Sequence, residues 1–294
     1  MQVSGFSFVR NAIKLGYPVV EALRSILPIC DELVIAVGRS EDNTFELIKS
    51  IGDKKIKIIE TEWDKKDFVR GKVYSIQTDI ALEECQGDWC FYIQADEVVH
   101  EKYLPVVLSR MKELIDDDEV QGLLFDYLHF WGSYDYYQRS RRWYRREIRV
   151  IRNNIGVQGW LDAQGFRING RKLKVAKVDA YVYHYGWVRP PDVMTDKNIV
   201  FDTIHHSREW VENKYKDAPS TFNYGDPKYL AKFSDSHPKV MGDRIAEYNW
   251  DFSGGEKAGH AHERLIDRIR SFVEDRVLHY RVGEYKNYIL LKNR

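Results

Sequence analysis

The sequence is poor in cysteine and balanced in charge, and both features exclude classes of protein. Its 294 residues include three cysteines, Cys30, Cys85 and Cys90, an odd number without the spacing of metal ligands. A disulfide framework is therefore excluded, and reduced thiols predict a cytoplasmic protein. Lysine and arginine total 45, as do aspartate and glutamate. Because the net charge is zero, we expect no domain-wide positive field and no nucleic-acid partner.

Long apolar runs are missing as well. The longest fall far short of the roughly 20 residues that a helix needs to cross a bilayer. Residues 1–14 lack the basic and apolar regions of a secretory leader, so we expect none. The chain does have a surplus of aromatic side chains with polar tips, 19 tyrosines and 8 tryptophans. Such side chains suit a large wet cleft, although they also fill cores and interfaces.

The first part of the chain alternates short apolar runs with segments of helical spacing. This pattern predicts βαβ units, and so an α/β fold with a mostly parallel central sheet and helices on both faces. Ligands bind outside the carboxyl ends of parallel strands, so the polar turns at 38–44 and 94–97 are expected on one edge of the sheet. The predicted strands are 3–9, 32–37, 55–60 and 89–93, and the predicted helices are 18–27, 44–51, 73–85 and 104–115.

The pattern changes after about residue 120. Further strands are predicted at 121–130, 147–151, 165–168 and 178–184, followed by helical stretches such as 198–215. We therefore expect an α/β domain over residues 1–190 and a mainly helical C-terminal extension over residues 191–294. An amphipathic, arginine-rich segment at 262–280 has three open placements: on an anionic membrane surface, against the α/β body, or in a homodimer interface.

Residues 94–97, Gln-Ala-Asp-Glu, carry the sharpest chemical signal, a carboxylate pair at the exit of a buried strand. Oxygen ligands in that position suit Mg²⁺ or Mn²⁺. The alternative is that Asp96 or Glu97 caps the following helix. His184, at the end of a predicted aromatic strand, is a second candidate ligand, and its alternative is an ordinary core histidine.

Seven arginines interleaved with aromatic residues lie between residues 139 and 152. Such clusters suit bidentate recognition of phosphates, and they suit nucleic acid equally. The zero net charge favours a localised anion pocket, against the alternative of a solvated surface neutralised by the acids at 116–119.

Two aspartates are candidates for a general base. Asp162 lies in a glycine-flanked loop, where a carboxylate can reach a substrate hydroxyl. Asp135 is a rival in a tyrosine-rich loop, and turn aspartates of no catalytic role are common.

In their order and spacing, several motifs between residues 3 and 190 resemble glycosyltransferase family 2 with the GT-A fold, especially bacterial enzymes of the lipopolysaccharide-core type. No single motif carries the resemblance. The motifs are Phe8-Val9-Arg10-Asn11, residues 38–44, Trp63-Asp64-Lys65-Lys66-Asp67-Phe68, residues 87–97, Arg149-Val150-Ile151-Arg152, residues 159–162 and His184-Tyr185-Gly186.

The resemblance implies transfer of a sugar from a nucleotide-diphosphate-sugar donor, first of all a UDP-sugar, to a hydroxyl of a glycan or lipid-linked acceptor. It implies inversion at the anomeric carbon and a divalent cation, Mn²⁺ or Mg²⁺, at the donor diphosphate. Such an enzyme would build cell-surface polysaccharide in the cytoplasm, with peripheral contact to the membrane as an open option.

Residue roles follow from the same resemblance. Asp96 matches the second aspartate of the family's Asp-X-Asp motif and Gln94 stands at the first, so one carboxylate of the motif is missing. His184 matches a histidine near the metal or diphosphate, and Asp162 matches the base. The implied donor-binding residues are Arg10, Arg39, Asp42, Asp64, Lys72, Asp79, Gln94, Arg149 and Arg152, and the expected acceptor platform is Trp131, Tyr134, Asp135 and Trp160.

Two other functions stay open. A sugar nucleotidyltransferase would be expected to carry a glycine-rich loop with a basic residue after its first strand, where this chain has Gly5-Phe6-Ser7-Phe8. A non-catalytic glycan- or RNA-binding module would use the arginine cluster at 139–152. In the RNA case, steep salt dependence without nucleotide-sugar binding would distinguish it.

Overall fold

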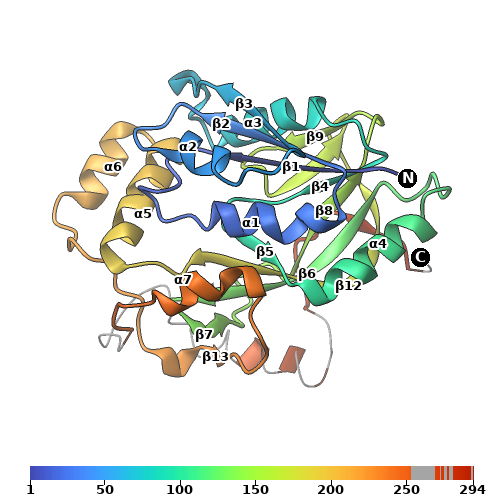
Figure 1. Ribbon diagram of the computed structural model, residues 1–294. Coiled ribbons are helices and arrows are strands. Elements are labelled where there is room, and N and C mark those ends of the chain that lie inside the picture. Colours follow the sequence, from blue (N-terminus) through green and yellow to red (C-terminus); the bar gives the residue numbers. More distant parts are fainter. Residues whose placement is uncertain (253–268, 272, 275–276, 278–280, 293) are drawn as a thin grey trace.

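The computed structural model in Figure 1 describes residues 1–252, 269–271, 273–274, 277, 281–292 and 294. Within this part of the chain, eleven strands form one large sheet and three form a small one. The strands are β1 (Val3–Val9), β2 (Glu32–Gly38), β3 (Ile56–Thr61), β4 (Trp89–Tyr92), β5 (Glu97–Val99), β6 (Gly122–Trp131), β7 (Ser133–Gln138), β8 (Arg146–Arg152), β9 (Val157–Trp160), β10 (Gly165–Ile168), β11 (Arg171–Lys172), β12 (Lys174–Trp187), β13 (Ala231–Lys232) and β14 (Ile289–Leu290).

Helices alternate with strands up to α4 (Leu104–Glu113). The strands β6 to β12 then follow one another, and the remaining α-helices come after β12. Short 3₁₀ turns lie at η1 (Leu27–Ile29), η2 (Lys65–Asp67), η3 (Glu101–Tyr103), η4 (Pro227–Tyr229) and η5 (Lys239–Met241). The α-helices are α1 (Val19–Ile26), α2 (Thr44–Lys49), α3 (Lys72–Glu83), α4 (Leu104–Glu113), α5 (Pro191–His205), α6 (Arg208–Tyr215) and α7 (Gly242–Ala246). None of the helices in the described part has the length and apolar character that a bilayer crossing requires.

The N-terminal half of the large sheet is parallel. β1 pairs with β2 on one side and with β4 on the other, and β2 pairs with β3. β2 reads Glu-Leu-Val-Ile-Ala-Val-Gly and is buried from Leu33 to Gly38, as expected of a strand covered on both faces. The four strands predicted between residues 3 and 93 are confirmed.

Beyond β4 the sheet becomes mixed. β8 runs antiparallel to β4 and to β6, and the long β12 lies parallel to β6. Apolar side chains of α1, α2 and α4 cover one face of this sheet, and α3 with the small sheet β9–β11 covers the other. The expected α/β class, with a largely parallel sheet and helices on both faces, is confirmed.

The chain after residue 190 is mainly helical where it is described, and Figure 1 shows α5 and α6 together at one side of the body. The helix expected over residues 198–215 is two helices, because His206 is extended and Ser207 starts α6 by accepting a hydrogen bond from the Trp210 amide. Two short strands return to the large sheet: β13 pairs with β7, and β14 with β12. The domain boundary at residue 190 stays a prediction, and most of the amphipathic segment at 262–280 lies outside the described residues.

Candidate functional site

A cleft of about 580 Å³ opens at the carboxyl ends of β1, β2 and β4. The two polar turns that were expected on one edge of the sheet both reach it, one through Glu41 and the other through Gln94 and Asp96. Residues from α5 close the opposite wall. The polar residues of the lining are Arg10, Asn11, Lys14, Glu41, Gln94, Asp96, Asp162, Gln164, His184, Lys197, Asn198, Asp202, Thr203 and Lys214.

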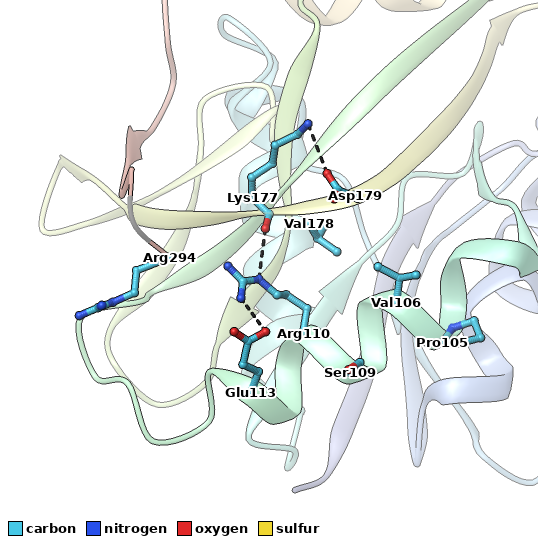
Figure 2. Close-up of a pocket in the computed structure, with 9 residues that line it drawn as sticks. All are labelled: Pro105, Val106, Ser109, Arg110, Glu113, Lys177, Val178, Asp179 and Arg294. Carbon is cyan, nitrogen blue, oxygen red and sulfur yellow. Dashed lines mark hydrogen bonds and ion pairs between the residues drawn. The ribbon is translucent and has the colours of Figure 1, made fainter.

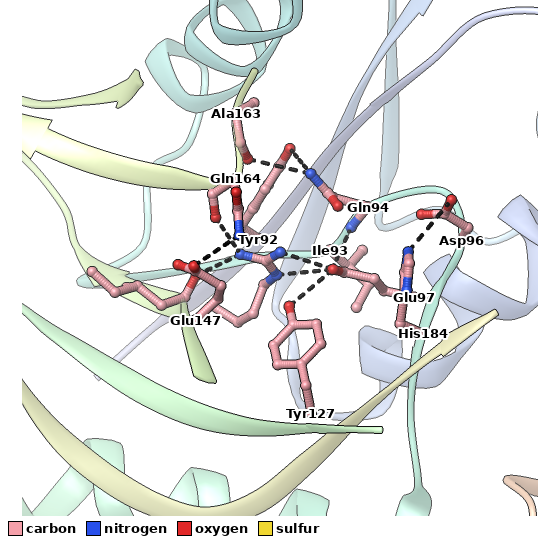
Figure 3. Close-up of polar contacts among 12 residues, drawn as sticks. Tyr92, Ile93, Gln94, Asp96, Glu97, Tyr127, Glu147, Ala163, Gln164 and His184 are labelled. Atoms are coloured by element: carbon pink, nitrogen blue, oxygen red, sulfur yellow. Dashed lines mark hydrogen bonds and ion pairs between the residues drawn. The ribbon is translucent and has the colours of Figure 1, made fainter. Parts of the chain in front are cut away.

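Asp96 and His184 face each other in this cleft (Figure 3), with 3.8 Å between the carboxylate Oδ2 and the imidazole Nε2. They come from different elements, the turn after β4 and strand β12. Gly186 keeps the space beside both atoms open, because a Cβ at this position would lie 2.4 Å from His184 Nε2 and 2.7 Å from Asp96 Oδ2.

His129, on β6, determines which nitrogen of His184 carries the proton. Its Nε2 lies 2.7 Å from the carbonyl oxygen of Tyr144, which can only accept, so this nitrogen carries the proton. Burial is the main cause that lowers the pKa of both histidines, so both rings are uncharged at neutral pH. The Nδ1–H of His184 then donates to His129 Nδ1 at 3.0 Å, and Nε2 of His184 presents a lone pair to Asp96.

Positive charge surrounds the Asp96 carboxylate. Burial alone would raise the pKa of this carboxyl group, but His184, which is charged only in acid, and the Lys197 and Arg189 cations outweigh burial and lower it. The Lys197 ammonium lies 3.9 Å from Asp96 Oδ2, and burial lowers the pKa of this lysine to about 7. Asp96 therefore stays ionised in a region where cations outnumber anions.

Gln94 and Glu97 shape the site without pointing into it as ligands. Glu97 is fully buried and receives two hydrogen bonds of 2.8 Å from Arg149 and one of 2.9 Å from Tyr127. Gln94 donates to the carbonyl of Ala163 (Figure 3). Arg149 donates to the carbonyl of Gln164. Both contacts hold the loop that carries Asp162. Neither Asp96 nor Glu97 caps the next helical turn, because His100 caps η3.

The Asp162 loop is a tight turn between β9 and β10. Leu161 and Ala163, on either side of Asp162, have φ angles of 52° and 57°, a left-handed conformation that is rare outside glycine. Strained backbone of this kind is held by its surroundings and gathers at functional sites. Gly71 packs directly on this turn, since a Cβ there would approach the Asp162 Cβ to 3.0 Å.

A second cavity, of about 420 Å³, lies on the other side of Asp162. It shares four lining residues with the cleft, Trp143, Tyr144, Asp162 and Gln164, so the two spaces are neighbours along these residues. Its other lining residues are Arg141, Arg142, Glu147, Trp160, Leu161, Arg281, Gly283, Glu284, Tyr285 and Asn287.

A third hollow lies between α4 and β12, away from the cleft (Figure 2). Its charged side chains have partners on the protein: Arg110 pairs with Glu113, and Lys177 pairs with Asp126 and Asp179. The residues that line this hollow include no carboxylate and histidine facing each other as Asp96 and His184 do in the cleft.

The residues expected to bind the donor are only partly brought together. Arg10 and Gln94 line the cleft, with the Arg10 guanidinium 5.6 Å from the centre of the Trp63 ring. The others lie outside the lining and have local partners. Arg39 forms an ion pair with Glu62 on the surface, and Lys72 forms one with Asp67. Asp64 caps η2. Asp42 accepts hydrogen bonds from the backbone amides of Lys14 and Thr44, and Asp79 accepts one from the amide of Gly159.

The arginines of the 139–152 cluster, which were expected to form an anion pocket, mostly hold the fold together. Arg149 is paired with buried Glu97, Arg146 with Asp126 and Arg145 with Glu284. Arg152 stacks on Trp89 and donates to the carbonyls of Leu114, Ile115, Asp117 and Val120. Neither Arg149 nor Arg152 lines the cleft.

The expected acceptor platform is divided as well. Trp160 lines the second cavity and is 38% exposed. Trp131 is buried against Trp187, with ring centres 4.7 Å apart, and Tyr134 is buried among other aromatic residues. Asp135 is exposed and lines neither cavity.

Two residues of the site, Lys197 and His129, belong to no sequence motif that would predict their place in it. Lys197 is one lysine in a helix beyond the expected α/β domain, and His129 is one histidine in an aromatic strand. Gly186 belongs to the His184-Tyr185-Gly186 motif, but the motif does not show that this glycine lies against Asp96.

The cleft, with its facing Asp96 and His184, lies at the edge of a mostly parallel α/β sheet. The model of the glycosyl transferase family 2 matches residues 17–172, which is more than half of the chain. The chain belongs to glycosyl transferase family 2, a family of glycosyltransferases, as its motifs indicated.

Individual proteins match this chain over a smaller part of its length or at low sequence identity. The lipopolysaccharide core biosynthesis glycosyltransferase LpsC of Rhizobium meliloti is 33% identical over 129 residues, and the match covers 43% of each chain. The crystal structure of S. aureus TarS 1-349 has a TM-score of 0.40 at 15% identity, covering 69% of this chain and 65% of that one. Glucosyl-3-phosphoglycerate synthase from Mycobacterium tuberculosis, solved with Mg²⁺ and UDP, has a TM-score of 0.31 at 16% identity, covering 43% of each chain.

Proposed function

We propose that this protein transfers a sugar from a nucleotide-diphosphate-sugar to a hydroxyl of a glycan or lipid-linked acceptor, with inversion at the anomeric carbon. One observation carries the proposal. The Asp96 and His184 pair and the Asp162 carboxylate line one cleft at the carboxyl edge of the sheet, in a chain of glycosyl transferase family 2. The cleft is the donor site, and the second cavity receives the acceptor.

Asp96 Oδ2 and His184 Nε2 suit a divalent cation, because both offer an electron pair to the space that Gly186 leaves open. No group of three or more His, Cys, Asp or Glu side chains gathers around a metal position in the described part of the chain. Donor phosphate oxygens and water would therefore complete the coordination, as is usual for Mg²⁺. A cation bound there would supply positive charge to the leaving diphosphate.

The acceptor side depends on Asp162. In an inverting transfer the acceptor oxygen attacks from the face opposite the leaving group, and a base removes its proton. Asp162 lines both spaces, so its carboxylate reaches an acceptor hydroxyl that enters from the second cavity. Trp160 and Tyr285 are exposed rings there, and Asn287 and Gln164 offer hydrogen bonds, which is a lining that suits a sugar.

A change of Asp162 to asparagine is expected to lower kcat by about 100-fold or more, because a positioned base contributes on that order. Binding of the nucleotide is expected to stay within about threefold of the unchanged protein, since the diphosphate lies at Asp96. Steady-state kinetics and nucleotide titration measure the two effects. Asp118→Asn, an exposed aspartate beyond α4, is the matched control. Unchanged kcat in Asp162→Asn would contradict the assignment of the base.

Thermal-shift screening tests the proposed function as a whole. UDP-, GDP-, CMP- and dTDP-sugars are offered with Mn²⁺ and with EDTA. A ligand that binds the folded state raises the melting temperature by mass action, so one nucleotide class is expected to shift it by several degrees. If none of the UDP-, GDP- and dTDP-sugars shifts it under either condition, the proposal of a diphosphate donor is wrong.

A further inference from the structure

Lys197 is a buried lysine whose ammonium group has hydrogen-bond donors left over for a ligand. Its side chain is 11% exposed and lies in the lining of the cleft. The ammonium donates one hydrogen bond, of 2.7 Å, to the carbonyl of Gly186. A lysine ammonium has three N–H donors, so two remain for the cleft and for Asp96, which lies at 3.9 Å, beyond hydrogen-bond distance.

A second buried cation lies near the same carboxylate. Arg189 is 1% exposed, its guanidinium carbon lies 4.9 Å from the centre of the Tyr17 ring, and none of its three side-chain nitrogens has a hydrogen-bond partner among the described residues. Its charge acts on both Asp96 and Lys197. Arg189 and the protonated form of Lys197 against one carboxylate leave a buried excess of positive charge, which is costly until an anion joins them.

We propose that Lys197 is a phosphate-binding residue of the donor site, and that its ammonium contacts the diphosphate beside Asp96. The inference rests on the proposed function, because the diphosphate belongs to the proposed donor. The residue lies on α5, beyond residues 17–172 that match the family model, so the donor site of this chain is completed by the segment that follows the family region.

The position of Gln94 supports the same assignment. The Gln-Ala-Asp-Glu segment has an amide where the family motif has its first carboxylate, and this amide holds the Asp162 loop instead of facing the cation position. Compared with the family motif, the site has one carboxylate fewer, at Gln94, and it also holds the ammonium group of Lys197. Both differences favour the binding of an anionic ligand, and they make that binding less dependent on a divalent cation.

The test compares nucleotide binding in Lys197→Met and Lys197→Arg with the unchanged protein, using UDP, GDP and dTDP as probes. Calorimetric titrations are run in EDTA and in MnCl₂. Loss of one charge-assisted hydrogen bond is expected to weaken binding in Lys197→Met by about 10- to 100-fold, with the larger loss in EDTA. Lys197→Arg keeps the charge and is expected to recover most of the affinity.

Lys112→Met makes the same change at an exposed position on α4 and is expected to bind like the unchanged protein. Melting temperatures show that each variant is folded. Equal affinity of Lys197→Met and the unchanged protein, in the conditions where the latter binds, would overturn the role of Lys197 and leave the proposed function intact. If the unchanged protein binds none of the three probes in EDTA or in MnCl₂, the proposed function fails and this inference with it.

Discussion

Replacement of Asp96 by asparagine is expected to lower the rate of sugar transfer by about 1,000-fold or more. The side chain keeps its size, but the charge that faces His184 across 3.8 Å is lost. A cation at a developing negative charge contributes several kcal/mol to the transition state, and each 1.4 kcal/mol is a factor of ten in rate. The measurement is kcat/KM with the nucleotide-sugar identified by thermal shift.

The fold of Asp96→Asn is expected to survive, because no hydrogen bond within 3.5 Å to the Asp96 carboxylate is found among the described residues, and because Lys197, whose pKa burial lowers to about 7, can lose its proton once the carboxylate is removed. A melting temperature within a few degrees of the unchanged protein would show this. Gly186→Ala is the complementary variant: it keeps both ligand atoms and fills the space between them. We expect it to lose Mn²⁺-dependent nucleotide binding, and near-normal activity in both variants would show that the pair does not act on the donor.

The fold could be predicted well from the sequence because its signals are local. The apolar run of β2 and the helical spacing of α1 depend on residues next to each other in the chain, and both elements begin and end within a residue of the prediction. The position of the 94–97 turn at the carboxyl edge of the sheet could be predicted because the strands before it were expected to be parallel. Short strands such as β13 and β14 were not predicted, because two residues carry no periodic pattern and these strands exist through their partners.

The site could be predicted less completely, because residue type does not tell in which direction a side chain points. Asp96 and His184 were predicted as a pair, and the structure brings them face to face. Arg149 was predicted to bind the donor, yet its side chain turns into the core to meet Glu97. Lys197 lies about a hundred residues from Asp96 in the chain, and only the fold places it in the same cleft.

A change of Arg149 to methionine is expected to lower the free energy of unfolding by about 3–5 kcal/mol, a large fraction of the 5–15 kcal/mol typical of a folded protein. The guanidinium and the Glu97 carboxylate are both fully buried, so removal of one leaves the other charge without its partner. Urea unfolding followed by tryptophan fluorescence measures the loss. Arg110→Met, which removes a partly exposed ion pair with Glu113, is the control and is expected to cost about 1 kcal/mol or less.

The double variant Arg149→Met with Glu97→Leu distinguishes a buried unpaired charge from a general loss of packing. Replacing both partners by apolar residues removes the unpaired carboxylate, so the double variant is expected to be more stable than Arg149→Met alone. Full recovery is not expected, because Tyr127 loses the acceptor of its hydroxyl and the Gln164 carbonyl loses its donor. If the double variant is less stable than the single one, the loss in Arg149→Met does not come from an unpaired Glu97 carboxylate. If Arg149→Met costs no more than Arg110→Met, the buried pair does not stabilise the fold in the way its burial predicts.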